Sequence, residues 1–297
     1  MIMVTIKEKV QENKRYFYLT HAFRKGKSVL TKEKYLGSEI PKNIEELKKA
    51  FVQEIYVQEW YSKFEQIRKN HATEEKKLPK SALDKEINNF MIKFTYDTNR
   101  IEGSTLTLKE TARLLEEGIA PSQKPLSDAK ETEAHRDLFY EMLKYNRDLN
   151  LQIVLYWNKQ LLKSTKQDIA GKIRTHQVAI AGSKFLPPSP VEVAPALEEF
   201  FSWYSKNKDK INPVELAALV HLKCVTIHPF TDGNGRISRL MMNFVLHKKG
   251  FPLLNIPYVK RSGYYTALER SQIKKEERIF LQWFFRRYLE EWKRYWK

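Results

Sequence analysis

The sequence predicts a mainly α-helical protein with a small β-hairpin near its N-terminus. Apolar residues recur at helical spacing through most of the 297 residues, whereas β-prone runs are confined to residues 15–37 and 172–186. The composition, 42% hydrophobic and 12% aromatic, is that of a globular chain that buries a large core. We therefore expect a helical bundle, organised as an N-terminal accessory region at residues 1–80 and a core domain at residues 81–297.

The accessory region begins with the predicted hairpin. Residues 15–23 are aromatic and β-prone, residues 24–27 form a basic turn, and residues 28–37 are the return strand. A helix then begins after Pro41 and runs to about Asn70, followed by a charged break at residues 73–79. The hairpin has two interpretations: it covers a helical core, or its lysines, arginines and aromatic residues contact nucleic acid.

The core domain shows apolar residues at helical spacing in segment after segment. Thr105–Thr107 are residues that commonly precede a helix, and Gly103 is the residue type that most often ends one. A β-prone stretch with a turn at residues 181–184 and a proline cluster at 187–190 interrupts the helical pattern. Helices are expected at residues 84–100, 107–115, 128–145, 151–162, 195–204, 214–227, 240–246 and 278–296.

The rest of the chain is organised around residues 228–239, with the sequence HPFTDGNGRISR between two apolar helices. Pro229 disfavours helical geometry at His228, so the first helix should end there. Gly233 and Gly235 allow a tight turn into the second helix, whose first N–H groups and positive dipole end form an anion site.

The charged side chains of this stretch suit a nucleotide phosphate. Arg236 and Arg239 are three residues apart and share one face of the helix, where planar guanidinium groups fit phosphate oxygens. Asp232 is a hard oxygen ligand for Mg²⁺, which binds one or two carboxylates together with substrate phosphates. His228 accepts a proton near neutral pH. The residues therefore predict a polyphosphate–Mg²⁺ site with a general base beside it.

This stretch resembles the signature of the Fic family, H-x-F-x-[D/E]-G-N-G-R-x-x-R, at every fixed position. The resemblance implies a helical fold with a β-hairpin flap that transfers AMP from ATP to a Ser, Thr or Tyr hydroxyl of a target protein. It implies that His228 is the base, that Phe230 anchors the loop and that Asp232 holds Mg²⁺. It also implies phosphate binding by Gly233, Asn234 with its side-chain amide, Gly235, Arg236 and Arg239.

A second resemblance lies at the end of the helix predicted near residues 84–103. Thr98, Glu102 and Gly103 match the family's inhibitory motif, [S/T]-x-x-x-E-[G/N]. The resemblance implies that Glu102 pairs with Arg239 and forces bound ATP into an unproductive pose, so the enzyme is autoinhibited from an N-terminal helix.

Two further segments resemble parts of the family's site. Residues 171–190 resemble the flap that docks the target by strand addition, with Ala181, Gly182 and Ser183 nearest the nucleotide. Residues 262–269 resemble a segment that lies near the adenine, with Tyr264 and Tyr265 as contacts. Altogether the resemblance covers about residues 84–285.

The remaining observations concern the cellular location of the protein and the alternatives to AMP transfer. Cys224 is the single cysteine, no apolar run reaches the length of a membrane span and the N-terminus is charged, so we expect a cytoplasmic protein without a disulfide. The net charge of +17 keeps open a basic nucleic-acid-binding or regulatory module that lacks catalysis. The family resemblance also leaves open removal of AMP by the same site, self-modification and a homodimer.

Overall fold

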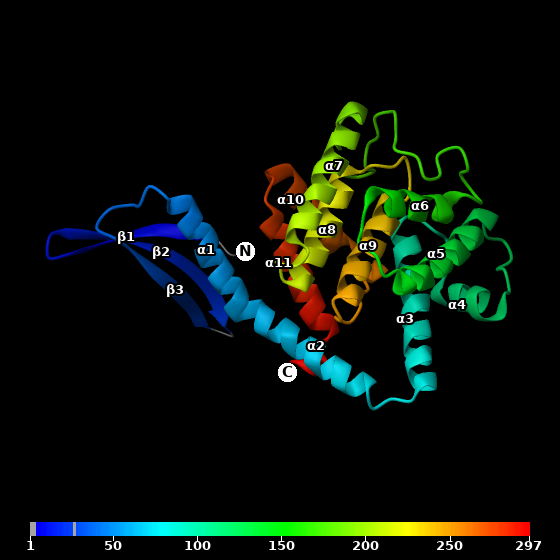
Figure 1. Cartoon of the computed structure of the whole chain (residues 1–297), viewed down its shortest axis with the longest axis horizontal. Helices are drawn as coiled ribbons and strands as arrows, with labels where there is room; N and C mark the ends of the chain where they lie inside the picture. The colour runs from blue at the N-terminus through cyan, green and yellow to red at the C-terminus, as the bar shows by residue number, and fades with distance from the viewer. Residues whose placement is uncertain (1–3, 26–27) are drawn as a thin grey trace. The chain divides into compact units, whose positions relative to one another are not determined.

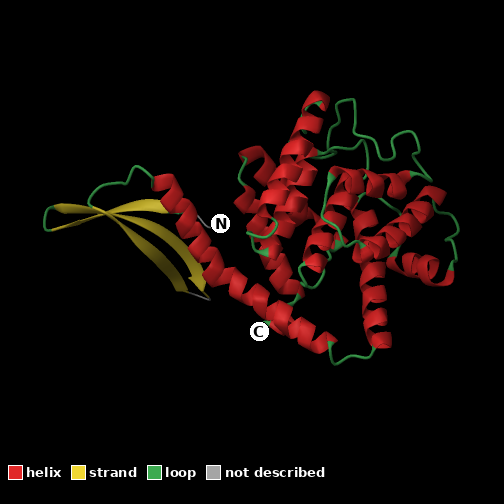
Figure 2. Ribbon diagram, viewed as in Figure 1, coloured by secondary structure: helices red, strands yellow, loops and turns green. Residues whose placement is uncertain are grey.

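A computed structural model of the chain describes residues 4–25 and 28–297 and confirms the mainly α-helical class (Figures 1 and 2). The chain divides into two compact units, Met1–Gln66 and Ile67–Lys297. This division lies N-terminal to residue 80, where the sequence predicts the boundary, and falls inside the helix Ser62–Glu75, because the second half of that helix packs within the second unit, where Asn70 donates to the carbonyl of Tyr295 (2.7 Å). The border between an accessory region and a core domain at residue 80 stays a prediction.

The first unit holds an antiparallel sheet of three strands: β1 (Thr5–Gln11), β2 (Lys14–Lys25) and β3 (Ser28–Gly37). The two strands of the predicted hairpin are therefore confirmed as β2 and β3, whereas residues 26–27 of its predicted turn lie outside the described residues; the strand β1 was not predicted. Glu12 and Asn13 form the turn between β1 and β2, and both have a positive φ (49° and 61°). Such turns are usually recognised in a sequence by an Asn-Gly pair, which is absent from these two positions. The sheet is followed by α1 (Ile44–Tyr56), a π-helical turn (Val57–Tyr61) and the start of α2 (Ser62–Glu75).

The second unit is a bundle of helices around a buried pair. The bounds are α3 (Lys80–Ile101), α4 (Leu108–Glu117), α5 (Leu126–Lys144), α6 (Leu151–Leu162), α7 (Pro190–Asn207), α8 (Pro213–Ile227), α9 (Asn234–Lys248), α10 (Arg261–Lys274) and α11 (Glu277–Glu291). Short 3₁₀ turns lie at Tyr258–Lys260 and Lys293–Tyr295.

The buried pair is α8 and α9, which pack against each other at the centre of the bundle (Figure 1). Helix α8 also contacts α7 and α11, whereas α9 contacts α3, α5 and α6. Eleven of the fifteen residues of α8 are buried, which accounts for its nearly continuous apolar sequence. The loop between these two helices is therefore anchored at both ends in the core.

Two predictions about the segment before α8 were wrong in detail. The predicted flap at residues 171–190 contains no β-strand, and Figure 2 shows it as loop. Prolines 187, 188 and 190 have no N–H to donate to a ladder. The helix predicted from residue 195 begins at Pro190, because Ser189 and Glu192 form a capping box there and proline is tolerated at the first helical position.

Among the described residues, no helix is both long enough and apolar enough to cross a membrane. Cys224 lies buried in α8, and burial raises the pKa of its thiol to about 12. The thiol is thus a core group and stays protonated at neutral pH.

Candidate active site

The loop between α8 and α9 makes two abrupt changes of direction. His228 ends α8 in the left-handed conformation, with φ 51°, and Pro229 follows it. Gly233 precedes α9 with φ 84°, and a Cβ there would lie 3.0 Å from the side-chain nitrogen of Asn158. Position 233 therefore needs glycine, both for its positive φ and for the lack of space for a Cβ. The two changes of direction keep the first turn of α9 close to the end of α8.

The loop is held rigid by side chains that bond its backbone. The Asn234 side chain donates to the carbonyl of Phe230 (2.7 Å) and accepts from the N–H of Phe230 (2.9 Å). Phe230 itself is buried, as predicted. The Asn234 amide is therefore engaged within the loop, which differs from the predicted phosphate contact. The N–H of Gly233 donates to the Asp232 carboxylate, so the N–H groups that follow it in the first turn of α9 are what the helix N-terminus offers to an anion.

His228 is held as a neutral base. Its Nδ1 lies 3.3 Å from the carbonyl oxygen of Val225, which only accepts, so Nδ1 carries the proton and Nε2 keeps a lone pair. Burial lowers the pKa of His228 below its ordinary value. At neutral pH the ring is then unprotonated, which is the state that a general base requires.

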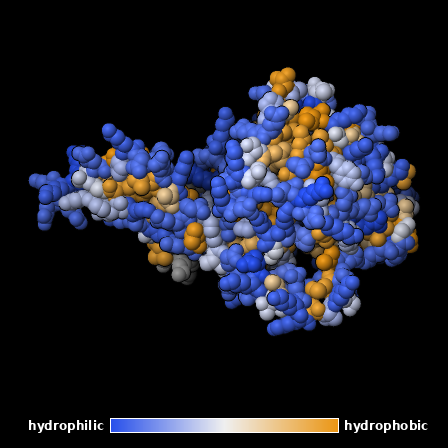
Figure 3. All heavy atoms as spheres, in the orientation of Figure 1, coloured by the Kyte–Doolittle hydropathy of each residue, from blue (hydrophilic) through white to orange (hydrophobic). Residues whose placement is uncertain are grey.

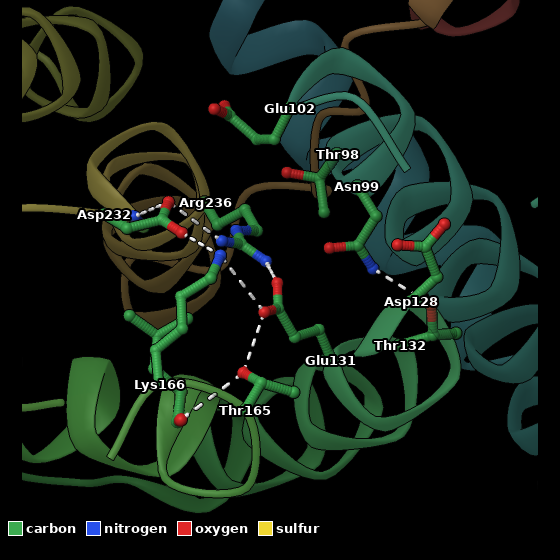
Figure 4. A network of polar contacts seen from close by, with 12 residues as sticks. Thr98, Asn99, Glu102, Asp128, Glu131, Thr132, Thr165, Lys166, Asp232 and Arg236 are labelled. Carbon is green, nitrogen blue, oxygen red and sulfur yellow. Dashed lines mark hydrogen bonds and ion pairs between the residues drawn. The ribbon is translucent and has the colours of Figure 1, made fainter. Parts of the chain in front are cut away.

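A network of four charged side chains, those of Asp232, Arg236, Glu131 and Lys166, joins the loop to the helices around it (Figure 4). Arg236 donates to Asp232 (3.1 Å) and to Glu131 of α5. Lys166, in the loop after α6, contacts Asp232 and lies 3.4 Å from Glu131. Thr165 also donates to Glu131 (2.8 Å). Two cations and two carboxylates thus balance each other around the buried guanidinium of Arg236.

The network keeps Asp232 ionised. Burial alone would raise the pKa of Asp232, but Arg236 and the ammonium of Lys166 outweigh it and hold the pKa below the ordinary value. An ionised carboxylate next to a helix N-terminus is the donor type that Mg²⁺ binds together with phosphate oxygens. Within the described residues no group of three His, Cys, Asp or Glu side chains could hold a metal.

Glu102 and Arg239 form an ion pair, as predicted. The Glu102 carboxylate lies 2.7 Å from Nη2 of Arg239, whose side chain is only 1% exposed. Thr98 adds two contacts, because its hydroxyl and its carbonyl accept from the same guanidinium (2.6 and 3.1 Å). A Cβ on Gly235 would lie 2.1 Å from the Glu102 carboxylate. The carboxylate therefore lies directly against the first turn of α9, where an anion is favoured.

The segment at residues 172–189 is fixed to the loop by one side chain. The buried guanidinium of Arg174 donates to the carbonyls of His228 (2.8 Å) and Pro188 (2.6 Å). The backbone N–H of Arg174 donates to the carbonyl of Pro229 (3.0 Å). At the tip, Ser183 donates to Glu269 of α10 (3.2 Å). This clamp takes the place of a strand ladder between the two arms of the predicted flap.

The two predicted adenine contacts differ in exposure. Tyr264 is 1% exposed, and its hydroxyl bonds His221 (2.8 Å) and accepts from Arg239 (3.3 Å). Tyr265 is 44% exposed and donates to the carbonyl of Ile101 (3.0 Å). Tyr264 is thus a core residue that supports Arg239, because its ring is enclosed by α8 and α11 aromatics, whereas Tyr265 still offers a surface.

A cavity of about 550 Å³ lies between this segment and helices α7, α8 and α10. Thr226, Ile227 and Gln272 are among the residues lining it, and none of the predicted phosphate-binding residues is. On the face of the molecule in Figure 3, hydrophobic residues gather along α7. An apolar hollow therefore adjoins the end of α8 next to the candidate base.

Residues 148–246, which include the whole loop and its two helices, match the Fic/DOC family. The chain carries a Fic domain. A segment of 181 residues is 35% identical to a protein adenylyltransferase, fic-1, of Caenorhabditis briggsae and 33% identical to protein adenylyltransferase Fic of Nematostella vectensis. Each match covers 59% of this chain but only 35% and 42% of those relatives, so the chain spans well under half of their length.

Solved structures show the same fold around the Fic domain. A Fic domain-containing signalling protein of Bacteroides thetaiotaomicron has a TM-score of 0.69 and 28% identity, over 77% of this chain and 94% of that one. Fic-1 of Caenorhabditis elegans has a TM-score of 0.68 and 26% identity, over 86% and 77% of the two chains.

Three residues that support the Fic domain's loop were not predicted from the sequence. Glu131 and Lys166 complete the charged network, and the buried Asn158 donates to the carbonyl of Asp232 (3.0 Å) while accepting from Gly171 (2.8 Å). They come from α5, α6 and the loop after α6, and a polar side chain in an amphipathic helix carries no local signal of such a role. A buried asparagine within the apolar run of α6 was the one hint available.

Proposed function

We propose that this chain is a protein adenylyltransferase that moves AMP from ATP to a Ser, Thr or Tyr hydroxyl of a target protein. The observation that carries the proposal is a neutral histidine with a free Nε2 lone pair at one end of a loop whose other end is an arginine-rich helix N-terminus. The adenylyltransferases of C. briggsae and N. vectensis, matched over 59% of this chain, support it.

The proposed reaction is one in-line displacement. The target hydroxyl gives its proton to Nε2 of His228 as its oxygen bonds to the α-phosphorus of ATP, and the bond from that phosphorus to the bridging oxygen breaks to release pyrophosphate. The first turn of α9 faces the α- and β-phosphates, and Arg239 holds the outer phosphate. Mg²⁺ on Asp232 would neutralise phosphate charge. In this proposal Tyr265 contacts the adenine, and the tip residues Ala181–Ser183 lie nearest the nucleotide.

We infer that Glu102 keeps this activity low. Its carboxylate occupies the guanidinium of Arg239 and lies against Gly235, so an ATP phosphate meets a negative charge at the place it would bind. Like charges at such short range disfavour each other, and ATP is then held away from the geometry of in-line attack.

Replacing Glu102 by glycine is expected to raise AMP transfer about 5- to 150-fold, the usual range for one regulatory contact. The measurement is transfer of label from α-labelled ATP with Mg²⁺ to proteins of a cell extract, including the enzyme itself. Glu117→Gly, an exposed glutamate at the end of α4, is the matched control and should leave transfer unchanged. Unchanged transfer in Glu102→Gly, with ATP bound normally, would show that Glu102 does not inhibit.

The same site supports the reverse outcome through one specific contact. The Glu102 carboxylate lies beside the anion site and is able to orient a water against an AMP–protein bond. If the wild type releases AMP from a protein labelled by Glu102→Gly, and Glu102→Gly does not, then the enzyme removes AMP when Glu102 is paired with Arg239. Absence of ATP binding by every variant would instead leave a basic binding module without catalysis.

Lys166 is expected to compete with Mg²⁺ for Asp232, because its ammonium contacts the carboxylate that we propose as the metal ligand. Lys166→Met should tighten binding of Mg²⁺ in the presence of a non-hydrolysable ATP analogue by about 2- to 5-fold, the range for a partly exposed ion pair. Calorimetric titration of the metal measures this, with the neighbouring exposed Lys163→Met as control. Weaker metal binding in Lys166→Met would mean that Lys166 contacts the nucleotide phosphates and does not compete with the metal.

The proposed partner is a protein that presents a hydroxyl to the segment at residues 172–189. A second copy of the chain is one such protein, and self-modification and a homodimer are tested by the label on the enzyme and by its mass in solution.

A further inference from the structure

The three-stranded sheet of the first unit carries tyrosines and lysines on one face. Strand pairing places Tyr18 opposite both Lys7 and Tyr35, and Tyr16 opposite Lys9. Residues paired in this way project to the same side of a sheet, as do residues two apart along a strand. The five side chains therefore share one face.

The opposite face is covered by the helical part of the same unit. Leu19, next to Tyr18 along β2, is fully buried. Its neighbours on that side, Lys32 and Lys34, bond Gln58 (2.6 Å) and Glu54 in the helices that follow the sheet. Because successive side chains of a strand alternate, the tyrosine face points away from these helices.

The tyrosine rings form a cluster that remains accessible. The ring of Tyr35 lies 5.3 Å from that of Tyr18 and 6.2 Å from that of Tyr16, and Tyr35 is 56% exposed. The ammonium of Lys9 lies 4.6 Å from the centre of the Tyr18 ring and is also paired with the carboxylate of Glu33 in β3 (2.6 Å), whereas Lys7 is exposed. The cluster is thus an aromatic surface with a cation at its edge, supported from behind by the sheet.

Positive charge is concentrated in the same strands. Residues 1–37 contain nine Lys and Arg against three Glu, a net charge of +6, whereas residues 44–66 contain three Lys against five Glu, a net charge of −2. The charge of the unit is therefore divided between a basic sheet and an acidic helical side. A polyanion is attracted to the sheet and away from the helices.

We propose that the face formed by Lys7, Lys9, Tyr16, Tyr18 and Tyr35 binds single-stranded nucleic acid. Unpaired bases stack on exposed aromatic rings, and lysines beside the rings contact the phosphates. A duplex keeps its bases stacked on each other and offers the rings nothing to stack on. An acidic peptide would use the lysines but not the rings. Single strands are the partner that uses both features of the face.

The test is fluorescence anisotropy of the full chain with labelled oligothymidine and oligouridine of about 20 nucleotides, longer than one small domain covers. Tyr18→Ser with Tyr35→Ser leaves the net charge unchanged at neutral pH, so it separates stacking from the general attraction of a chain with net charge +17. We expect the double variant to bind single strands about 5- to 150-fold more weakly for each base that loses its stacking partner.

Tyr156→Ser, which removes a 41% exposed tyrosine from α6, is the matched control and should bind as the wild type does. Lys7→Gln should reduce the dependence of affinity on salt by about one phosphate contact. If the double variant does not fold, Tyr35→Ser alone, at the most exposed of the three rings, gives the same comparison.

Three results would overturn the proposal. Equal affinity of the tyrosine variants and the wild type would show that binding comes from charge alone. Tighter binding of a duplex of the same length would exclude stacking as the mode. Absence of binding to any oligonucleotide at 0.15 M salt would exclude nucleic acid as the partner of this face.

Discussion

Replacing His228 in the Glu102→Gly background is expected to lower AMP transfer by about 10²- to 10⁴-fold, the usual contribution of a positioned general base. The reason is that Nε2 of His228, the proposed proton acceptor, keeps its lone pair because the carbonyl of Val225 fixes the tautomer of the ring. ATP binding should remain, because the proposed phosphate contacts come from α9 and not from His228.

Two variants of His228 make this test independent of folding. His228 has φ 51°, which alanine adopts with strain, whereas asparagine tolerates it better. His228→Asn and His228→Ala should therefore lose transfer alike while differing in stability. His247→Ala, which removes an exposed histidine at the end of α9, should leave transfer unchanged. Transfer that survives both His228 variants would remove the histidine from the mechanism.

The pH dependence of AMP transfer is a second test of His228 as the base. Burial lowers the pKa of His228 below its ordinary value, so the unprotonated base predominates at neutral pH. Transfer should be constant from neutral pH upward through the range in which the protein is stable. It should fall only as the pH drops through this lowered pKa, since protonation then removes the base. A rate that still rises well above neutral pH would point to another group.

Replacing Glu131 by alanine is expected to destabilise the second unit by about 3–5 kcal/mol, the usual cost of breaking a buried ion pair. The guanidinium of Arg236 is almost fully buried and would keep only Asp232 as a charged partner, while Thr165 would keep only its longer bond to the carbonyl of Leu162 (3.4 Å). In a domain of this size each kcal/mol lowers the melting temperature by about 2–4 °C.

Denaturant unfolding measures the change directly, with Glu133→Ala as the matched control. Glu133 lies on the same helix, and the described part of the chain shows no ion pair for it. Glu131→Gln should fall between the two, because its amide oxygen still accepts from Arg236 and Thr165 without the charge. If Glu131→Ala lowers the free energy of unfolding no more than the control does, the ion pair with Asp232 is sufficient to stabilise the buried Arg236.

The centre of this protein could be predicted from its sequence. Residues 228–239 contain the proposed base, the carboxylate, the turn glycines and both arginines in one short stretch of chain, so local geometry is enough to bring them together. The ends of α8 and α9 follow from Pro229 and Gly233 in the same way. The pairing of Glu102 with Arg239 was predicted across more than one hundred residues, but only through a family resemblance.

How that centre is supported could not be predicted from the sequence and follows from the packing of the helices. Whether Asn234 faces a phosphate or its own loop depends on the positions of the Phe230 backbone groups, which spacing does not specify. Tyr264 and Tyr265 are adjacent, yet one is buried beneath Arg239 and the other exposed, because a helix turns successive residues by about 100°.

The same limit applies to residues distant in the chain. Glu131 and Lys166 meet Asp232 and Arg236 only because α5, the loop after α6 and α9 pack together, and the resulting balance of charges depends on distances set by all three. The segment at residues 172–189 has a β-prone sequence, but its prolines and the Arg174 clamp hold it as loop. Local patterns determine which groups are present at this site, and packing between distant segments determines which of them remain free to react.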